Sequence, residues 1–120
     1  MKNVTLDIYA GDSLEIICNV VDQDKQPVDL TGGEVLWQLG QSNWPRNPVP
    51  VLSKDSTNPN DLVISGSSFL VKIYSAETHL KQGNYYHEAQ VTLADGSVGH
   101  PIGGKVKIRQ SLTDQPDTPI

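Results

Sequence analysis

The sequence predicts an antiparallel β-sandwich of seven to eight short strands with one short helical turn. Two observations lead to this fold class. Alternation of apolar and polar residues is the dominant pattern in the 120-residue sequence, and it is the pattern of strands that bury one face. Turn-forming residues separate the alternating segments, and the chain contains ten glycines and eight prolines. A small closed barrel is the alternative architecture that fits the same pattern.

The first half of the chain contains three alternating segments. Residues 4–9 and 14–21 alternate on either side of a break at 10–12, so each segment predicts a strand. The turn-rich residues 22–33 lead into the sequence EVLWQL at 34–39. A third strand is therefore expected there.

The second half begins with a region that is poor in strand signals. Residues 40–61 contain four prolines, which lack the amide hydrogen that a central strand needs. This region is predicted to be a long loop with a short edge strand at 51–53. Four further strands follow, at residues 62–64, 69–74, 85–93 and 104–110.

The helical candidate is SAETHLKQG, residues 75–83. Ser75 can cap its first turn, and Glu77 carries a negative charge where the helix dipole favours one. Gly83 is predicted to end the helix. One or two turns are expected, and a helix so short needs tertiary contacts to be stable.

Composition and charge bear on the class of protein. The formal net charge of −5 gives a field that repels phosphate backbones and anionic lipid, so binding to nucleic acid or a membrane is not expected. Cys18 is the only cysteine, which excludes an intrachain disulfide and fits synthesis in a reducing cytoplasm. The N-terminus alternates instead of carrying a long apolar run, so neither a secretion signal nor a membrane anchor is expected.

Four sequence features occur in order along the chain. They are GDSLEI, then PVDLTGG followed by EVLWQL, then SAETHLKQGNYYHEAQV, and finally an ADGSV hairpin before KVKI. Together they resemble the immunoglobulin-like domain of tailed-phage structural proteins, which is found at the N-terminus of baseplate upper proteins and in related small virion proteins. The predicted domain spans residues 1–110. Residues 111–120 are predicted to be a polar, extended C-terminal tail.

The resemblance implies roles for four residues. Domains of this type often carry a tyrosine after the corner before the penultimate strand, whose hydroxyl bonds to upstream backbone, and Tyr85 has the matching position. His87 stands where antibody domains have their second cysteine, with Cys18 at the position of the first. Trp37 is expected to pack near Cys18. The chain therefore departs from the antibody pattern and is similar to a version without a disulfide.

Residues that could carry chemistry were weighed against structural roles. Cys18 and His87 could form a nucleophile and its base, but both lie on predicted core faces, where a cysteine behaves as a small apolar residue. The three histidines lack the close spacing of a zinc site. Asp22, Asp24 and Asp29 could gather around calcium, but the run lacks the glycine and glutamate of a calcium-binding loop. The sequence thus predicts no enzymatic activity, no metal and no cofactor.

The candidate interface residues are aromatic or basic. Trp44 and Arg46 lie in the proline-rich loop, where Trp44 either contacts a partner or folds over one open end of the sandwich. Lys105, Lys107 and Arg109 alternate on the outward side of the last strand. They either meet an acidic partner or prevent an edge strand from pairing with another chain.

These expectations converge on a non-enzymatic bacteriophage virion protein. It would dock onto other structural proteins of the tail, baseplate, collar or fibre, in symmetric multiple copies assembled in the host cytoplasm. A capsid decoration protein is the nearest alternative. A different class is a carbohydrate-binding module that contacts the host surface through Trp44, Tyr86 and Tyr9.

Overall fold

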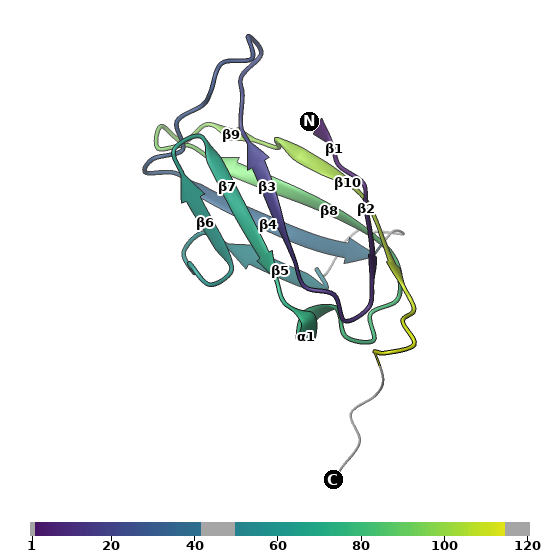
Figure 1. Ribbon diagram of the computed structural model, residues 1–120. Coiled ribbons are helices and arrows are strands. Elements are labelled where there is room, and N and C mark those ends of the chain that lie inside the picture. Colours follow the sequence, from purple (N-terminus) through teal and green to yellow (C-terminus); the bar gives the residue numbers. More distant parts are fainter. Residues whose placement is uncertain (1, 42–49, 115–120) are drawn as a thin grey trace.

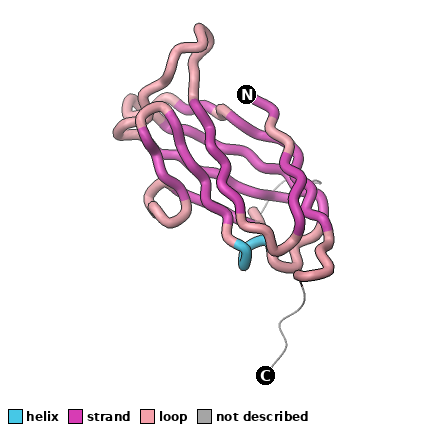
Figure 2. The backbone as a smooth tube through the Cα atoms, in the orientation of Figure 1, coloured by secondary structure: helices cyan, strands magenta, loops and turns pink. Residues whose placement is uncertain are grey.

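The computed structural model describes residues 2–41 and 50–114, which form two sheets with a common core (Figure 1). Strands account for most of the described chain, and the single helical turn lies at one end (Figure 2). The larger sheet contains β1 (Lys2–Asn3), β2 (Leu6–Tyr9), β4 (Glu34–Gln41), β5 (Leu52–Asp55), β8 (Gly83–Thr92), β9 (Val98–Gly99) and β10 (Ile102–Arg109). The smaller sheet contains β3 (Leu14–Asn19), β6 (Leu62–Ser65) and β7 (Ser68–Ile73).

The larger sheet has the order β10-β8-β4-β5, and these neighbours pair antiparallel. On its other side, β10 pairs in parallel with β1 and β2. The expectation of a purely antiparallel fold is therefore wrong for the N-terminal segment. After β2 the chain passes to the smaller sheet instead of turning back as a hairpin, so β2 lies beside β10 and runs in the same direction.

The smaller sheet has the order β3-β7-β6 and is antiparallel throughout. Among the described residues no strand pairing connects the two sheets, so the chain does not close into a barrel. The predicted two-layer, mostly β architecture is confirmed at this level. The described residues contain ten strands because the two-residue strands β1 and β9 add to the eight predicted segments.

The core lies between the sheets and consists of the inward residues of each alternating strand. Trp37 of β4 and Phe69 of β7 are its largest apolar side chains, and both are almost completely buried. Val71 and Ala89, on the middle strands of the two sheets, have no exposed surface. Burying one face of each strand is the main favourable contribution to folding here.

The corner between β7 and β8 differs from its prediction. Helix α1 covers only Ser75–Thr78 and begins after Tyr74, whose N–H donates to the Glu77 carboxylate at 2.8 Å. Ser75 is therefore not the cap. Leu80 adopts a positive φ of 54°, and Gly83 is the first residue of β8 rather than the end of the helix. The helix ends early because the backbone that follows it hydrogen-bonds to Asp114, as described below.

A close backbone contact attaches the N-terminal segment to β10. The carbonyl oxygen of Val4 lies 2.4 Å from the place where a β-carbon on residue 104 would stand, and Gly104 has none. A glycine is needed here for the close approach of the two chains. Val4 N–H also donates to the Gly103 carbonyl at 2.9 Å.

Candidate functional site

A buried histidine connects three segments of the larger sheet. Trp37 Nε1–H donates to His87 Nδ1 at 3.0 Å, so the ring proton is on Nε2, which donates to the Val4 carbonyl at 2.7 Å. Burial lowers the pKa of His87, and the bond to Val4 opposes this only in part. The neutral imidazole thus joins β4, β8 and the link between β1 and β2.

This hydrogen bonding gives His87 a structural role. Both of its ring nitrogens are occupied, so neither is free to accept a proton from Cys18. Cys18 is itself buried, and burial raises the pKa of its thiol. Cys18 and Trp37 belong to one core cluster, and His87 is buried next to Trp37, with the two ring centroids 5.9 Å apart.

Tyr85 makes the corner hydrogen bond that the resemblance implies. Its hydroxyl donates to the carbonyl of Lys81, four residues upstream, at 2.7 Å. Burial raises the pKa of Tyr85, which keeps the phenol protonated and able to donate. The bond fixes the entry of the chain into β8.

A buried lysine is the most prominent charged group that sequence reasoning missed. Lys54 of β5 is only 1% exposed, and its Nζ donates to Glu77 at 2.6 Å and to Asp61 at 3.2 Å. The Tyr74 ring lies 5.1 Å from the same nitrogen. Alternation from Leu52 could have placed Lys54 on the inward face, but the polar run that follows it indicated a loop.

The first part of the predicted tail packs on the corner. Asp114 accepts a hydrogen bond from Leu80 N–H at 2.7 Å and lies 2.6 Å from His79 Nδ1. These two contacts, the backbone bond first, lower the pKa of the Asp114 carboxyl. The first residues of the predicted tail, up to residue 114, therefore contact the sandwich and hold the backbone that follows α1.

The basic stripe of β10 is exposed, as expected, but β10 is not an edge strand. β8 pairs on one side of it and β1 and β2 on the other, so Lys105 and Lys107 do not protect an open edge. Arg109 binds the Asp7 carboxylate through two hydrogen bonds of 2.7 and 2.9 Å, which lower the pKa of Asp7. The other two predicted interface residues, Trp44 and Arg46, lie outside the described residues.

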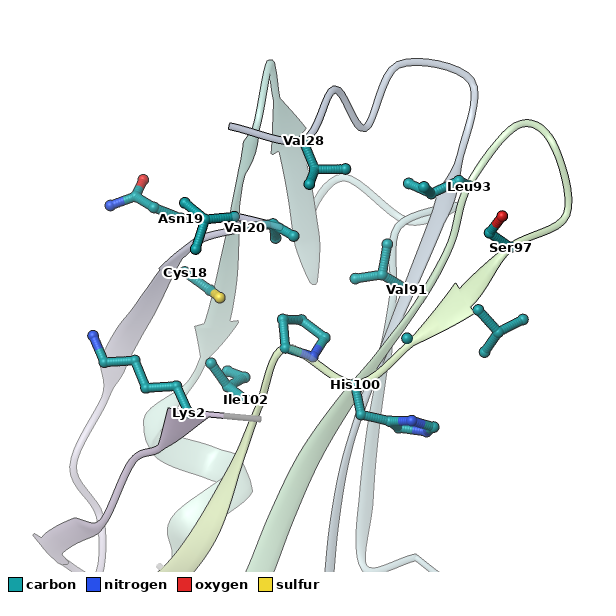
Figure 3. Close-up of a pocket in the computed structure, with 14 residues that line it drawn as sticks. Lys2, Cys18, Asn19, Val20, Val28, Val91, Leu93, Ser97, His100 and Ile102 are labelled. Atoms are coloured by element: carbon teal, nitrogen blue, oxygen red, sulfur yellow. The ribbon is translucent and has the colours of Figure 1, made fainter. Parts of the chain in front are cut away.

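An apolar pocket opens at the end of the sandwich opposite α1 (Figure 3). Its volume is about 450 Å³, and its walls come from both sheets and from the 97–101 turn region. The Cys18 sulfur points toward its centre, whereas Lys2, Asn19 and His100 point away. We call this feature the end pocket; its other main lining residues are Val20, Val21, Val28, Val91, Val98 and Ile102.

The end pocket is suited to an apolar insert. Val21 and Val98 on its rim are 53% and 55% exposed, and exposing such side chains to water is unfavourable unless another surface covers them. The described residues contain no group of three or more histidine, cysteine or acidic side chains that could hold a metal. Asp22 and Asp29 instead accept backbone hydrogen bonds within their own turns.

Comparison with known proteins adds no relative. No protein-family model matches the chain, and no curated protein sequence matches it. Within residues 2–41 and 50–114, no helix is long and apolar enough to cross a membrane.

Proposed function

We propose that this chain is a non-enzymatic structural protein of a bacteriophage particle, built on an immunoglobulin-like sandwich that docks onto other virion proteins. The strand order supports the domain type. The order β3-β7-β6 opposite β10-β8-β4-β5 corresponds to strands B-E-D opposite G-F-C-C′ of immunoglobulin-type domains. The Tyr85 corner and the position of Trp37 on the third of these strands agree with it.

The positions and hydrogen bonds of the reactive side chains support a structural role. His87 and Lys54, the two buried basic groups described above, make hydrogen bonds that hold strands and the corner together. Cys18 is one of the apolar residues that line the end pocket. His87 and Lys54 are therefore used in the architecture, and Cys18 contributes to an apolar surface.

The observation that carries the docking proposal is the end pocket with its exposed rim. Half of its lining residues are valine, leucine or isoleucine, so an apolar side chain from another virion protein would fit. By the resemblance to phage domains, the tail, baseplate, collar or fibre is the proposed position. Capsid decoration is the alternative position, and docking through the end pocket would serve there as well.

Localisation in intact phage particles tests the function. Antibody-gold labelling is expected on the tail, and labelling of the capsid faces would instead establish decoration. Particles that lack the protein altogether would contradict a virion role.

A variant of the pocket rim tests the docking surface separately. Val98→Asp places a charge at the rim and should strongly reduce incorporation into particles, while Ser53→Asp on the exposed side of β5 should leave it unchanged. Equal incorporation of both variants would exclude the end pocket as the docking site.

One observation keeps the carbohydrate-binding alternative open. Tyr9 and Tyr86 are 54% and 37% exposed, and they pair with Arg109 and Lys105 on the outer side of β10. Both tyrosines therefore lie on the same outer face of the larger sheet. Saturable binding of host polysaccharide that is lost in Tyr86→Ala or Trp44→Ala would establish glycan recognition and contradict a purely structural role.

A further inference from the structure

Strand β3 has one edge without a partner. Val20 N–H donates to the Ser67 carbonyl, so the even-numbered residues of β3 direct their backbone groups toward β7. The odd-numbered residues Glu15, Ile17 and Asn19 direct theirs to the opposite side. No described strand pairs there, and none of these three N–H groups has a partner among the described residues.

The edges on the other side of the sandwich are protected against pairing. β5 and β6 are only four residues long, and β5 carries the inward-pointing charge of Lys54. Short strands and inward charges are two ways in which proteins prevent edge-to-edge association. β3 has six residues, LEIICN, without a proline or lysine, so it lacks both of these protections.

An exposed apolar row leads across the smaller sheet to this edge. Ile17 pairs with Leu70, and Leu70 pairs with Val63, so the three side chains lie side by side on the outer face. Ile17, at the open edge, is 69% exposed. The row ends abruptly at the edge strand, where an apolar neighbour would continue it.

The core is also incompletely covered along this side. Leu14 of β3 and Leu6 and Ile8 of β2 pack against the core but remain partly exposed, whereas Val71 and Ala89 on the middle strands are fully buried. A neighbouring chain along this side would cover apolar surface that the monomer leaves in water.

We propose that β3 pairs with β3 of a second copy of this chain, antiparallel and about a two-fold axis at Ile17. In this register Ile17 faces Ile17 of the second copy, and Glu15 faces Asn19 rather than another carboxylate. The apolar row then continues through both copies. Moving the register by two, so that Ile16 lies on the axis, would place Glu15 opposite Ile17 and break the row.

The backbone of β3 is suited to this register. Glu15, Ile17 and Asn19 all present their groups outward, so three facing pairs would exchange roughly six hydrogen bonds. The same surface is used by both copies, as a closed two-fold dimer requires. This pairing is independent of the virion role, because it concerns the purified chain alone.

Sedimentation over a concentration series tests the pairing. The wild type is expected to shift from the 13.1 kDa monomer to a dimer as its concentration rises. Ile17→Lys places like charges opposite each other and should weaken the dimer by at least roughly tenfold. Ser53→Lys is the control, since it adds the same charge to an exposed strand residue on the opposite side of the sandwich. A monomeric wild type, or equal dimerisation of Ile17→Lys and wild type, would overturn the proposal.

A crosslink tests the register by a gain of signal. Ile17→Cys in a Cys18→Ala background should oxidise to a covalent dimer, because facing residues have α-carbons about 5.5 Å apart, within the range of a disulfide. Glu15→Cys in the same background should not, because its facing residue is Asn19. Faster crosslinking through residue 15 than through residue 17 would contradict the proposed register.

Discussion

Along one side of the sandwich, β5 lies beside β6, and Lys54 reaches from the larger sheet to Glu77 and Asp61 at the end of the smaller one. Along the opposite side, β3 forms the edge of the smaller sheet and β1 and β2 form the edge of the larger one, and no described pairing or ion pair joins these strands across the two sheets. We call these the closed side and the open side. On the open side, the strand pairing of β1 and β2 and the Val4 hydrogen bond to His87 tie the N-terminal segment to its own sheet, and Leu6 and Ile8 of β2 pack against the core.

The difference shows how a small sandwich manages two pairs of edge strands. On the closed side the buried charge of Lys54 is unfavourable to desolvate unless it is paired. The same inward-pointing charge makes this edge resist pairing with other chains. The open side keeps apolar residues partly exposed and leaves one long edge free. The closed side therefore favours an edge that stays unpaired, and the open side favours association with another chain.

The largest expected effect is on the closed side. Lys54→Ala removes the positive charge between Glu77 and Asp61 and leaves a cavity beneath α1, so the free energy of unfolding should fall by roughly 3 kcal/mol. Lys105→Ala is the control, because Lys105 is exposed and should change stability little. Urea denaturation measures both. Equal stability of the two variants would show that the ion network does not close this side.

A smaller loss is expected where the N-terminal segment meets β10. Gly104→Ala would place its β-carbon against the Val4 carbonyl and push the segment away, with a cost of about 2 kcal/mol. Gly99→Ala is a matched control, since its β-carbon would meet no atom within 4 Å. Thermal unfolding of both proteins makes the comparison. If Gly104→Ala were no less stable than Gly99→Ala, the role given to the close contact would be refuted.

Tyr85→Phe should cost about 1 kcal/mol, because it removes one hydrogen bond to Lys81 while the ring can stay in place. Tyr86→Phe, on the outer face of the same strand, provides the control. Urea denaturation should separate the two. No difference between them would mean that the corner is held by packing alone.

The pH dependence of stability tests the attachment of the open side through His87. Its pKa is lowered below the 6.5 of a free histidine, so the unfolded chain takes up the proton first as the pH falls. The stability is therefore fully present above pH 6.5 and declines below it. His87→Gln should reduce this decline in stability. His100→Gln is the control, because His100 is exposed, and it should leave the decline unchanged. An unchanged slope in His87→Gln would contradict the buried neutral imidazole.

Sequence patterns predict what depends on local periodicity. Alternation indicates that Trp37, Cys18 and His87 face inward, and the resemblance to immunoglobulin-like domains implies the bond made by Tyr85. The pattern carries no information on the partner of a strand, so the parallel pairing of β2 with β10 was not predicted. The contacts of Lys54 and Asp114 join residues that are distant in the chain, and a polar run gives no sign of them. The structural setting of Trp44 and Arg46 stays a prediction.

Amide hydrogen exchange at two protein concentrations tests the contrast between the sides most directly. The amides of Glu15, Ile17 and Asn19 should exchange rapidly in dilute protein and become protected at high concentration, because a second copy then accepts their hydrogen bonds. The amides of β5 and β6 should not respond to concentration. Protection of the β3 amides that is independent of concentration, or a concentration response on β5 and β6 instead, would contradict the assignment of an open and a closed side.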